Sequence, residues 1–471
     1  MFVQKYSAAL KKENLALKTR KLKIKNHIQK HLKINRAKNK IPTIAICCSG
    51  GGFRSMLSTA GFLCIAQKNN LLKVTSYITT ISGSSWFLIP WILSDNKINN
   101  FTNELILKLD EIYNFKQLKN LSIKKLKNTK NYLLETYLAF LKIKKIKKES
   151  NQNVSLVDLY GILLSSFLLS EFKEKKFDLK LSDLTKKINS GNYPFPMFLA
   201  TSQLNNYKYQ WLEFSPYYIA SSYLNSSISP WLLGATFYNG KSKNNISELP
   251  LGVLMGIFGS AFSTNIKDAI HRAINISSLK EIKHILQKTE TSIFNQNWAN
   301  KKIFPAQITN FTFGMPNSPI KDLNTIEVVD GGYSCNLPIQ PLLHPQRNID
   351  IIIVLDNTNQ KFSSSAFSLR EAETQAREAN LKFPPVDYKK AQNQSYSVFE
   401  DKSDPKCPII IYIPLKKDLS YSKDFDPHEK KYCNTTNFFY SSQQAQNLVG
   451  LTKHIATKYQ NDIWEVIKNK I

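Results

Sequence analysis

The stretch "CCSGGGFRSM", from Cys47 to Met56, ends an apolar run and begins a helical pattern with three glycines in a row. The run before the glycines, "IPTIAICCS" from Ile41 to Ser49, predicts a strand. Three adjacent glycines cost stability, so a group that approaches the backbone closely is expected there. Backbone amides of Gly50, Gly51 and Gly52 at a helix start are suited to hold an oxyanion, and a plain tight turn is the alternative. A phosphate-binding P-loop is disfavoured because no G-x-x-x-x-G-K-[ST] motif follows.

The rest of the chain alternates between strand and helix patterns around a helical interruption. A second strand, "TSYITTIS" from Thr75 to Ser82, leads into a helix, and helical sequence rich in Lys and Leu from about 100 to 190 then breaks the alternation. The apolar runs at 325–330 and 350–356 are typical of strands buried on both faces of a parallel sheet. Further strands are predicted at 192–204 and 406–415, and a closing helix at 443–471. These patterns predict an α/β fold.

The net charge of +29 is high and unevenly distributed along the 471 residues. Residues 1–40 contain thirteen Lys or Arg and one acid, and residues 116–148 contain eleven Lys and one acid. We expect the first segment to form a basic, partly helical arm outside the sheet, and both segments to form a common docking face for a polyanion. The alternative is lysine-rich codon usage on solvated faces, because only seven of the 64 basic residues are Arg. No nucleic-acid recognition motif is present, so anionic lipid is the favoured polyanion.

The sequence lacks the features of export and of membrane insertion. Its first residues contain no apolar run of signal-peptide length, and "LYGILLSSFLLS" from Leu159 to Ser170 is shorter than the roughly 20 residues that span a bilayer. The six cysteines show no CxxC and no metal-ligand spacing with the seven histidines. We therefore expect a cytoplasmic protein with reduced core cysteines, no metal site and no cofactor.

Polar residues follow several predicted strands, whose carboxyl ends form one edge of a parallel sheet. In "TISGSSW", Ser82 lies at a tight strand-to-helix turn and Gly83 lets the helix begin at once, as in a nucleophile elbow. Arg54 would bring a cation to the same edge. A serine nucleophile needs a base, but the histidines lie in helical or Pro-rich sequence. Asp330, which ends a buried strand, is the best candidate for that base, and an Asx turn is its alternative interpretation.

Five separated motifs occur in order along the chain: "SGGGFR", "SGSSW", "WLEFSPY", "MGIFGSAFS" and "VVDGGYSCNLPIQPLLHPQR". Over roughly residues 40–471 the chain resembles the catalytic domain of cytosolic (group IV) phospholipase A2 and the fungal lysophospholipases, distant relatives of patatin. The resemblance implies a patatin-like, mostly parallel sheet flanked by helices, with inserted cap segments at about 100–190 and 215–300. It also implies a dyad of Ser82 and Asp330, oxyanion donors at Gly51 and Gly52, and contact of Arg54 with the substrate phosphate.

Two departures from that family stand out. Thr80 occupies the position two residues before the nucleophile, where the family usually has glycine, and this predicts a more strained elbow or weaker activity. We also expect the chain to lack the calcium-binding C2 domain that precedes many animal members, with the basic segment 1–40 in its place. Calcium-driven membrane docking is therefore not expected.

The function that the resemblance implies is hydrolysis of phospholipid acyl esters, as a phospholipase A2 or lysophospholipase, through an acyl-enzyme on Ser82 at a membrane surface. A catalytically weak or silent lipid-binding relative is the alternative that Thr80 leaves open. The expected partner is an anionic phospholipid surface and not nucleic acid. The expected location is the cytoplasm with peripheral membrane association, and for a bacterial source non-classical secretion as an effector is the alternative.

Overall fold

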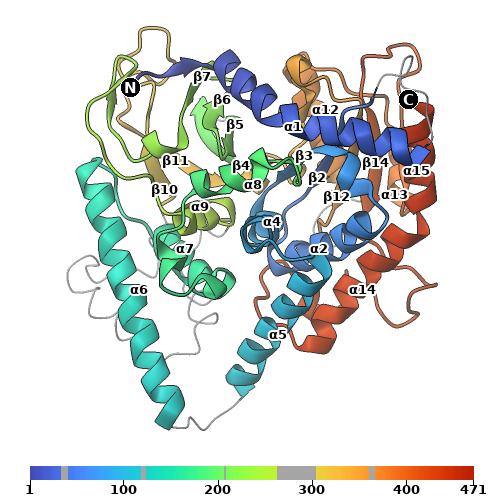
Figure 1. Ribbon diagram of the computed structural model, residues 1–471, viewed down its shortest axis with the longest axis horizontal. Coiled ribbons are helices and arrows are strands. Elements are labelled where there is room, and N and C mark those ends of the chain that lie inside the picture. The colour runs from blue at the N-terminus through green and yellow to red at the C-terminus, as the bar shows by residue number, and fades with distance from the viewer. Residues whose placement is uncertain (33–40, 118–122, 206–207, 262–303, 360–365) are drawn as a thin grey trace.

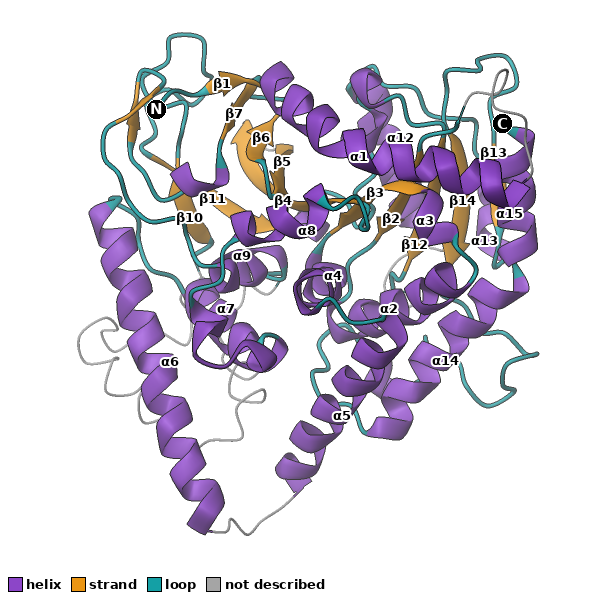
Figure 2. Cartoon of the chain, viewed as in Figure 1, coloured by secondary structure: helices purple, strands orange, loops and turns teal. Residues whose placement is uncertain are grey.

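The fold is built around one large sheet, seen in a computed structural model that describes residues 1–32, 41–117, 123–205, 208–261, 304–359 and 366–471 (Figures 1 and 2). Twelve strands of the described chain form this sheet, and a small separate pair joins β8 (Phe237–Tyr238) to β9 (Lys241–Ser242). Helices cover both sides of the large sheet (Figure 1). This layering is the predicted α/β arrangement.

The centre of the sheet is parallel, as predicted. The five parallel strands lie in the order β14 (Ile409–Pro414), β12 (Ile351–Asp356), β2 (Ile44–Cys48), β3 (Thr75–Thr80) and β4 (Phe195–Asn205). Every residue of the first four is buried, which explains their continuous apolar and β-branched sequences. Because the strands are parallel, the residues that follow β2 and β3 meet at the same carboxyl edge.

Antiparallel strands extend the sheet on both sides of this centre. The flanking strands are β5 (Lys208–Ser215), β6 (Tyr218–Ser221), β7 (Ser226–Ile228) and β1 (Gln4–Lys5) beyond β4, and β13 (Ser397–Phe399) beyond β14. The second predicted insertion, 215–300, therefore begins with strands of the sheet. It continues through helix α9 (Leu251–Phe258), and its residues 262–300 lie outside the described part of the chain.

One strand prediction was wrong in its direction. The run at 325–330 forms strand β11 (Thr325–Asp330), but β11 is antiparallel to both β4 and β10 (Ala306–Thr309). It also exposes Glu327, so it is not buried on both faces. The antiparallel direction still brings Asp330, at its carboxyl end, beside Ala200 in the middle of β4.

The predicted helical insertion lies between the parallel neighbours β3 and β4. After α4 (Ser82–Ser94), the helix of the predicted elbow, it contains α5 (Ile98–Gln117), α6 (Ile123–Glu149), α7 (Leu156–Leu168) and α8 (Thr185–Asn189). A fully buried ion pair between Lys147 and Asp158 (2.7 Å) ties α6 to α7, and the Lys147 ammonium also donates to the Gln307 carbonyl. Removing one partner of such a pair leaves an uncompensated buried charge, so the pair fixes how these helices meet.

The remaining helices pack against the two sides of the sheet. They are α2 (Gly52–Lys68), α3 (Leu71–Val74), α12 (Phe367–Glu378), α13 (Tyr388–Asn393), α14 (Ser442–Lys458) and α15 (Gln460–Asn469). Helices α2, α5 and α14 lie together on one side, and the closing helix predicted at 443–471 is the pair α14 and α15 (Figure 1). In the described part of the chain, no helix has both the length and the apolar character needed to cross a bilayer.

The N-terminal segment belongs to the fold, which corrects the expectation of a basic arm outside a sheet that begins at Ile41. Strand β1 pairs with β7, and helix α1 (Tyr6–Leu32) packs across the sheet. Arg347 forms buried ion pairs with Glu13 of α1 (2.9 Å) and Glu213 of β5 (2.6 Å). The hydroxyls of Tyr6, Tyr77 and Tyr218 donate to the same two carboxylates. Deleting this segment would therefore break a buried charge network.

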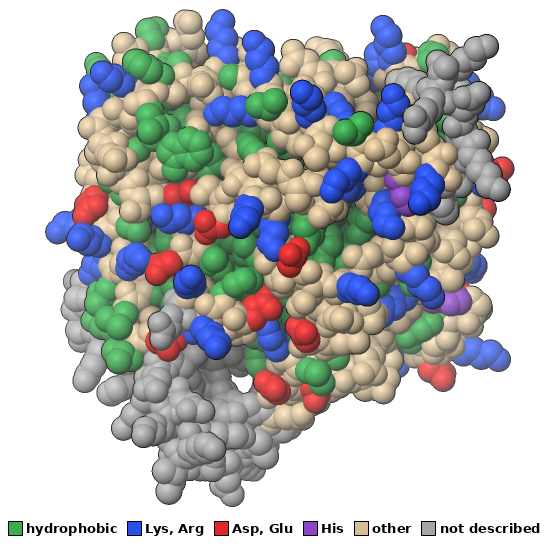
Figure 3. All heavy atoms as spheres, in the orientation of Figure 1, with side chains coloured by type: hydrophobic (Ala, Val, Ile, Leu, Met, Phe, Trp, Pro, Cys, Tyr) green, Lys and Arg blue, Asp and Glu red, His purple; other side chains and the backbone are tan. Residues whose placement is uncertain are grey.

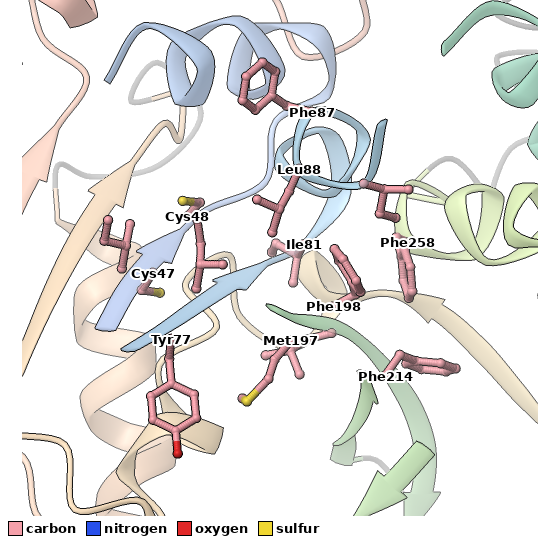
Figure 4. Close-up of a cluster of buried hydrophobic side chains, with 14 of the residues drawn as sticks. Cys47, Cys48, Tyr77, Ile81, Phe87, Leu88, Met197, Phe198, Phe214 and Phe258 are labelled. Carbon is pink, nitrogen blue, oxygen red and sulfur yellow. The ribbon is translucent and has the colours of Figure 1, made fainter. Parts of the chain in front are cut away.

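The core between β2, β3, β4 and the helices is apolar and continuous. Figure 4 shows Cys47 and Cys48 of β2, Ile81 after β3, and Phe198 of β4 in one cluster with aromatic rings from the neighbouring strands and helices. All six cysteines are buried and free, as predicted. This packing holds the carboxyl ends of β2 and β3 in fixed positions for the residues that follow them.

Candidate active site

Ser82 lies at a sharp turn directly after β3. Strand β3 ends at Thr80, and Ser82 is the first residue of α4 with a φ of 50°, in the left-handed region that non-glycine residues rarely adopt. Holding such a conformation costs about 1–3 kcal/mol, and such strain clusters at functional sites. The turn packs tightly, because a Cβ on Gly83 would lie 1.8 Å from the Gly52 carbonyl oxygen. The predicted elbow is thus present in its geometry.

Thr80, which stands where the family usually has glycine, packs closely at this turn. Its side chain is fully buried, and its hydroxyl lies 2.9 Å from the Ser85 hydroxyl in the first turn of α4. The φ of Thr80 is not among the positive values of the chain. A threonine at this position therefore links the end of β3 to the helix.

The three glycines are required mainly by the protein's own packing. A Cβ on Gly50 would lie 2.7 Å from Asn336 Oδ1, and one on Gly52 would lie 2.5 Å from the Thr435 carbonyl oxygen. Gly51 and Gly52 also have φ values of 141° and 62°, which disfavour any side chain. The glycines are thus explained in part by close contacts within the protein, in addition to the oxyanion that the sequence analysis favoured.

Hydrogen bonds hold the glycine loop in place from three sides. Asn336 accepts from the Gly50 amide through Oδ1 (3.2 Å) and donates to the Gly50 carbonyl through Nδ2 (3.3 Å). The Ser84 hydroxyl donates to the Ser49 carbonyl (2.6 Å), which ties the loop to the elbow helix. The Ser49 hydroxyl accepts from the Asn357 amide (2.6 Å). The amides of the loop are therefore preorganised.

Asp330 is buried beside the elbow. Its Oδ1 accepts from the Gly332 amide (2.9 Å), and its own backbone amide donates to the Ser260 hydroxyl (3.1 Å). Burial raises the pKa of the Asp330 carboxyl to about 7, although the Gly332 amide, the Ser82 hydroxyl and the Ala261 amide all lower it. Ser82 therefore lies next to the carboxyl. The Oδ2 atom of Asp330 has no hydrogen-bond partner in the described part of the chain. A carboxyl with a pKa near 7 is suited to proton transfer at neutral pH.

Arg54 is held by backbone carbonyls with one end of its guanidinium at the loop. Its Nε donates to the Asn357 carbonyl (2.9 Å) and its Nη1 to the Cys433 carbonyl (3.1 Å). Its Nη2 lies 2.9 Å from where a Cβ on Gly51 would be, and it has no hydrogen bond to the described residues. Arg54 thus presents a fixed cation beside the glycine loop, with two donors already used by the protein.

One cavity of about 370 Å³ brings most of these residues together. Its lining includes Gly51, Arg54, Ser82, Ala261, Asp330, Gly332, Tyr333, Asn336, Thr358, Asn359, Phe367, Ser368, Glu371 and Thr435. Gly52 does not line the cavity, because the Thr435 carbonyl covers it. Among the described histidines none lines the cavity, and His271 and His284 lie outside the described residues.

Several residues of the site were not predicted from the sequence. Ser260 and Ala261 lie within "MGIFGSAFS", and Asn336 lies within "VVDGGYSCNLPIQPLLHPQR", so these motifs carried the signal without a role for each residue. Glu371 of α12 has no such signal, since an isolated Glu in a helix normally lies on a solvated face. Burial raises the pKa of its carboxyl to about 7.

A serine at a strained strand-to-helix turn lies next to a buried carboxyl at one edge of the sheet of this α/β protein. The chain belongs to the lysophospholipase catalytic domain family, because residues 44–414 match the model of that family. This match spans the sheet from β2 to β14 and contains all the predicted site residues.

The chain is also similar to cytosolic phospholipases A2 of mouse and human. It is 23% identical to mouse (Mus musculus) cytosolic phospholipase A2 delta over 436 residues, which are 81% of this chain and 50% of the relative. The structure of human GIVD cytosolic phospholipase A2 superimposes with a TM-score of 0.77 at 21% identity, covering 97% of this chain and 64% of that one. The same human protein in complex with methyl gamma-linolenyl fluorophosphonate gives a TM-score of 0.72 at 22% identity, with the same coverage. The chain thus spans about half the length of the mouse relative, and the solved structures share its fold.

Proposed function

We propose that the chain is a phospholipid acyl-ester hydrolase, a phospholipase A2 or lysophospholipase, that uses Ser82 and Asp330. The observation that carries this proposal is the strained Ser82 turn beside a buried carboxyl whose pKa is about 7. Membership of the lysophospholipase catalytic domain family supports an acyl ester of a phospholipid as the substrate. The alternative is a catalytically weak or silent lipid-binding relative, and turnover distinguishes the two, since the Thr80 hydroxyl contact with Ser85 is compatible with both.

The reaction begins with proton transfer within the dyad. Asp330, as a carboxylate, takes the proton of the Ser82 hydroxyl while the serine oxygen attacks the ester carbonyl carbon. The resulting oxyanion is held by backbone amides of the glycine loop, where Gly51 lines the cavity and Gly52 is the second predicted donor. Asp330 then gives its proton to the departing alcohol oxygen of the lysophospholipid or glycerophospho product, which leaves an acyl ester on Ser82.

Hydrolysis of the acyl-enzyme completes the cycle, with water in the place of the departed alcohol. Asp330 takes a proton from a water molecule, whose oxygen attacks the acyl carbonyl, and the second oxyanion is held by the same amides. Collapse of this intermediate returns the proton to Ser82 and releases the fatty acid. One carboxyl thus serves as base and acid in both halves, which suits a pKa near 7.

Arg54 is proposed to hold the phosphate of the substrate. Arg54 lines the same cavity as Ser82, its Nη2 has no hydrogen bond to the described residues, and its contacts with the Asn357 and Cys433 carbonyls fix the guanidinium plane. A charge-assisted hydrogen bond from a fixed guanidinium to phosphate adds both affinity and orientation. This would place the ester of a bound phospholipid at a defined distance from the serine.

The proposed location is the cytoplasm, with peripheral binding to anionic membranes through α6. The described part of this helix exposes Leu134, Tyr137, Leu138 and Leu141 at helical spacing, next to the exposed Lys142, Lys144, Lys145 and Lys148. Such a combination of an apolar stripe and lysines is typical of helices that lie in a membrane interface.

A docking face shared by α1 and α6 is not supported by their positions. Arg20 of α1 donates to carbonyls of Leu72 and Thr75 at the amino end of β3, whereas Ser82 follows the carboxyl end of that strand. Figure 1 shows α1 and α6 on different sides of the molecule, and Figure 3 shows basic side chains spread over one face among acidic ones. Arg20 and Lys147 are also buried and unavailable to a membrane.

The activity is tested with phospholipids that carry a different label at each acyl position. The purified chain and Ser82→Ala are incubated with these lipids in mixed micelles, and the released fatty acids are identified. We expect release by the wild type and none by Ser82→Ala. Failure of the wild type to release acid from any phospholipid or lysophospholipid would contradict the proposal.

A further inference from the structure

The cavity contains a second carboxyl that the proposed chemistry does not use. Glu371, in the second turn of α12, lines the cavity with Ser82 and Arg54 and is half-buried. It makes no hydrogen bond or ion pair with the described residues. Burial is what raises the pKa of its carboxyl to about 7, with no described cation that offsets this effect. A half-buried carboxyl that has no partner among the described residues is available to a ligand with a cationic group.

The carboxyl and the guanidinium of this cavity do not neutralise each other. Burial lowers the pKa of Arg54, and the groups that oppose this are Tyr440, Cys433 and Asp356. Glu371 is not among the groups that shift the pKa of Arg54, and no ion pair joins the two side chains. The two opposite charges are therefore separated within a cavity of about 370 Å³. A ligand that carries both a negative and a positive group satisfies both of them.

Aromatic rings accompany Glu371 in the cavity lining. Tyr333, after β11, and Phe367, at the start of α12, both line the cavity. Aromatic faces attract ammonium groups, including quaternary ones that have no N–H to donate. A carboxylate with aromatic neighbours is thus suited to the cationic nitrogen of a lipid headgroup.

We propose that Glu371, with Tyr333 and Phe367, binds the ammonium group of a zwitterionic phospholipid headgroup whose phosphate contacts Arg54. This inference rests on the proposed phospholipid hydrolase function and adds the class of headgroup to it. Choline and ethanolamine phospholipids have a phosphate and an ammonium separated by two carbons, so they present both charges at once. Anionic headgroups such as glycerol lack the cation and meet an unpaired Glu371 instead.

The test is a competition within one micelle. Phosphatidylcholine and phosphatidylglycerol with identical acyl chains are mixed in equal amounts in a nonionic detergent, and the two lyso products are measured by mass. The ratio of kcat/KM for the two lipids then depends on neither enzyme concentration nor binding to the micelle. We expect the wild type to favour phosphatidylcholine and Glu371→Gln to lower the ratio about tenfold. Equal ratios in the wild type and in a folded Glu371→Gln protein would overturn the inference.

The matched control is Glu378→Gln on the same helix. Glu378 is exposed, forms a surface ion pair with Lys208 and does not line this cavity. Its substitution removes the same charge from α12, so we expect the ratio of the wild type. A drop equal to that of Glu371→Gln would show that net charge, and not the headgroup contact, sets the preference, and would overturn the inference.

A binding measurement separates this inference from the catalytic proposal. Calorimetry with the Ser82→Ala protein compares glycerophosphocholine with glycerol 3-phosphate, and both are then repeated in the Ser82→Ala, Glu371→Gln protein. Tighter binding of the choline compound that is lost with Glu371→Gln supports the headgroup site even if the wild type hydrolyses no lipid. No difference between the two compounds in Ser82→Ala would refute the site, even if the wild type is an active hydrolase.

Discussion

The rate of hydrolysis should rise with pH because Asp330 acts as the base. Burial raises the pKa of its carboxyl to about 7, and only the carboxylate can take the proton from Ser82. For a single group with that pKa, the ionised fraction is about 3% at pH 5.5 and about 90% at pH 8. The value of kcat/KM should therefore increase about 30-fold between these two pH values, with a slope of one on a logarithmic plot below pH 6.

The assay uses a small, neutral, soluble ester, so that neither a membrane surface nor a phosphate contributes to the profile. Near-ultraviolet circular dichroism at each pH checks that the protein stays folded. Glu371 shares the cavity and has a pKa of about 7 as well, so Glu371→Gln is measured in parallel. Its profile should keep the midpoint near 7, since the neutral ester presents no ammonium to Glu371.

Two results would refute this reasoning. A kcat/KM that stays constant from pH 5.5 to 8 would show that the base does not titrate in this range. If the midpoint near pH 7 disappears in Glu371→Gln, the titrating group is Glu371 and not Asp330. A midpoint near 7 that persists in Glu371→Gln agrees with the environment of Asp330, whose burial outweighs three hydrogen-bond donors.

Three further predictions follow from buried contacts. Arg54→Ala should lower kcat/KM on phospholipid about tenfold or more relative to the soluble ester, because it removes a charge-assisted contact with phosphate, and equal losses on both substrates would contradict this role. Arg347→Ala should lower the free energy of unfolding by about 3–5 kcal/mol at pH 7, because Glu13 and Glu213 stay buried without a cation, and an unchanged free energy of unfolding in urea would contradict this. Gly52→Ala should impair folding more than Gly332→Ala, since its Cβ would lie 2.5 Å from the Thr435 carbonyl oxygen whereas that of Gly332 meets nothing closer than 3.3 Å, and equal thermal midpoints would contradict this.

The central strands and the elbow could be predicted because their signals are local. β2 and β3 are short apolar runs that end at glycine or serine, and their boundaries in the structure fall within a few residues of the prediction. The polar residues Ser82 and Asp330 were expected together because each ends a strand. A local sequence pattern does not indicate the direction of a strand in the sheet. For this reason β11 was predicted to be one of the parallel strands.

The role of α1 could not be predicted because charged residues interrupt its buried face. The buried positions include Leu10, Glu13, Leu17, Arg20 and Ile24, which follow one another at spacings of three or four residues. This is a regular helical stripe, but Glu13 and Arg20 break its apolar pattern. Their partners, Arg347 and the backbone carbonyls before β3, lie far away in sequence. Only the folded chain reveals that these charges are satisfied.

The packing of the glycine loop also depends on contacts between residues that are far apart in sequence. Asn336 and Thr435 approach Gly50 and Gly52 from segments more than 280 residues away. The residue types at 336 and 435 do not indicate that these residues contact the glycines. The sequence favoured an approaching oxyanion over a plain tight turn as the reason for the glycines, whereas the structure adds close contacts with the protein's own side chains and backbone.

The most direct test of the central claim is to identify the nucleophile and its base by covalent labelling. A fluorophosphonate transfers its phosphorus to an activated serine oxygen and releases fluoride, and peptide mass spectrometry then locates the modified residue. We predict modification at Ser82 in the wild type, none in Ser82→Ala, and a labelling rate at least about 100-fold lower in Asp330→Asn than in the wild type. Modification of a different residue, or an unchanged rate in a folded Asp330→Asn protein, would contradict the dyad of Ser82 and Asp330.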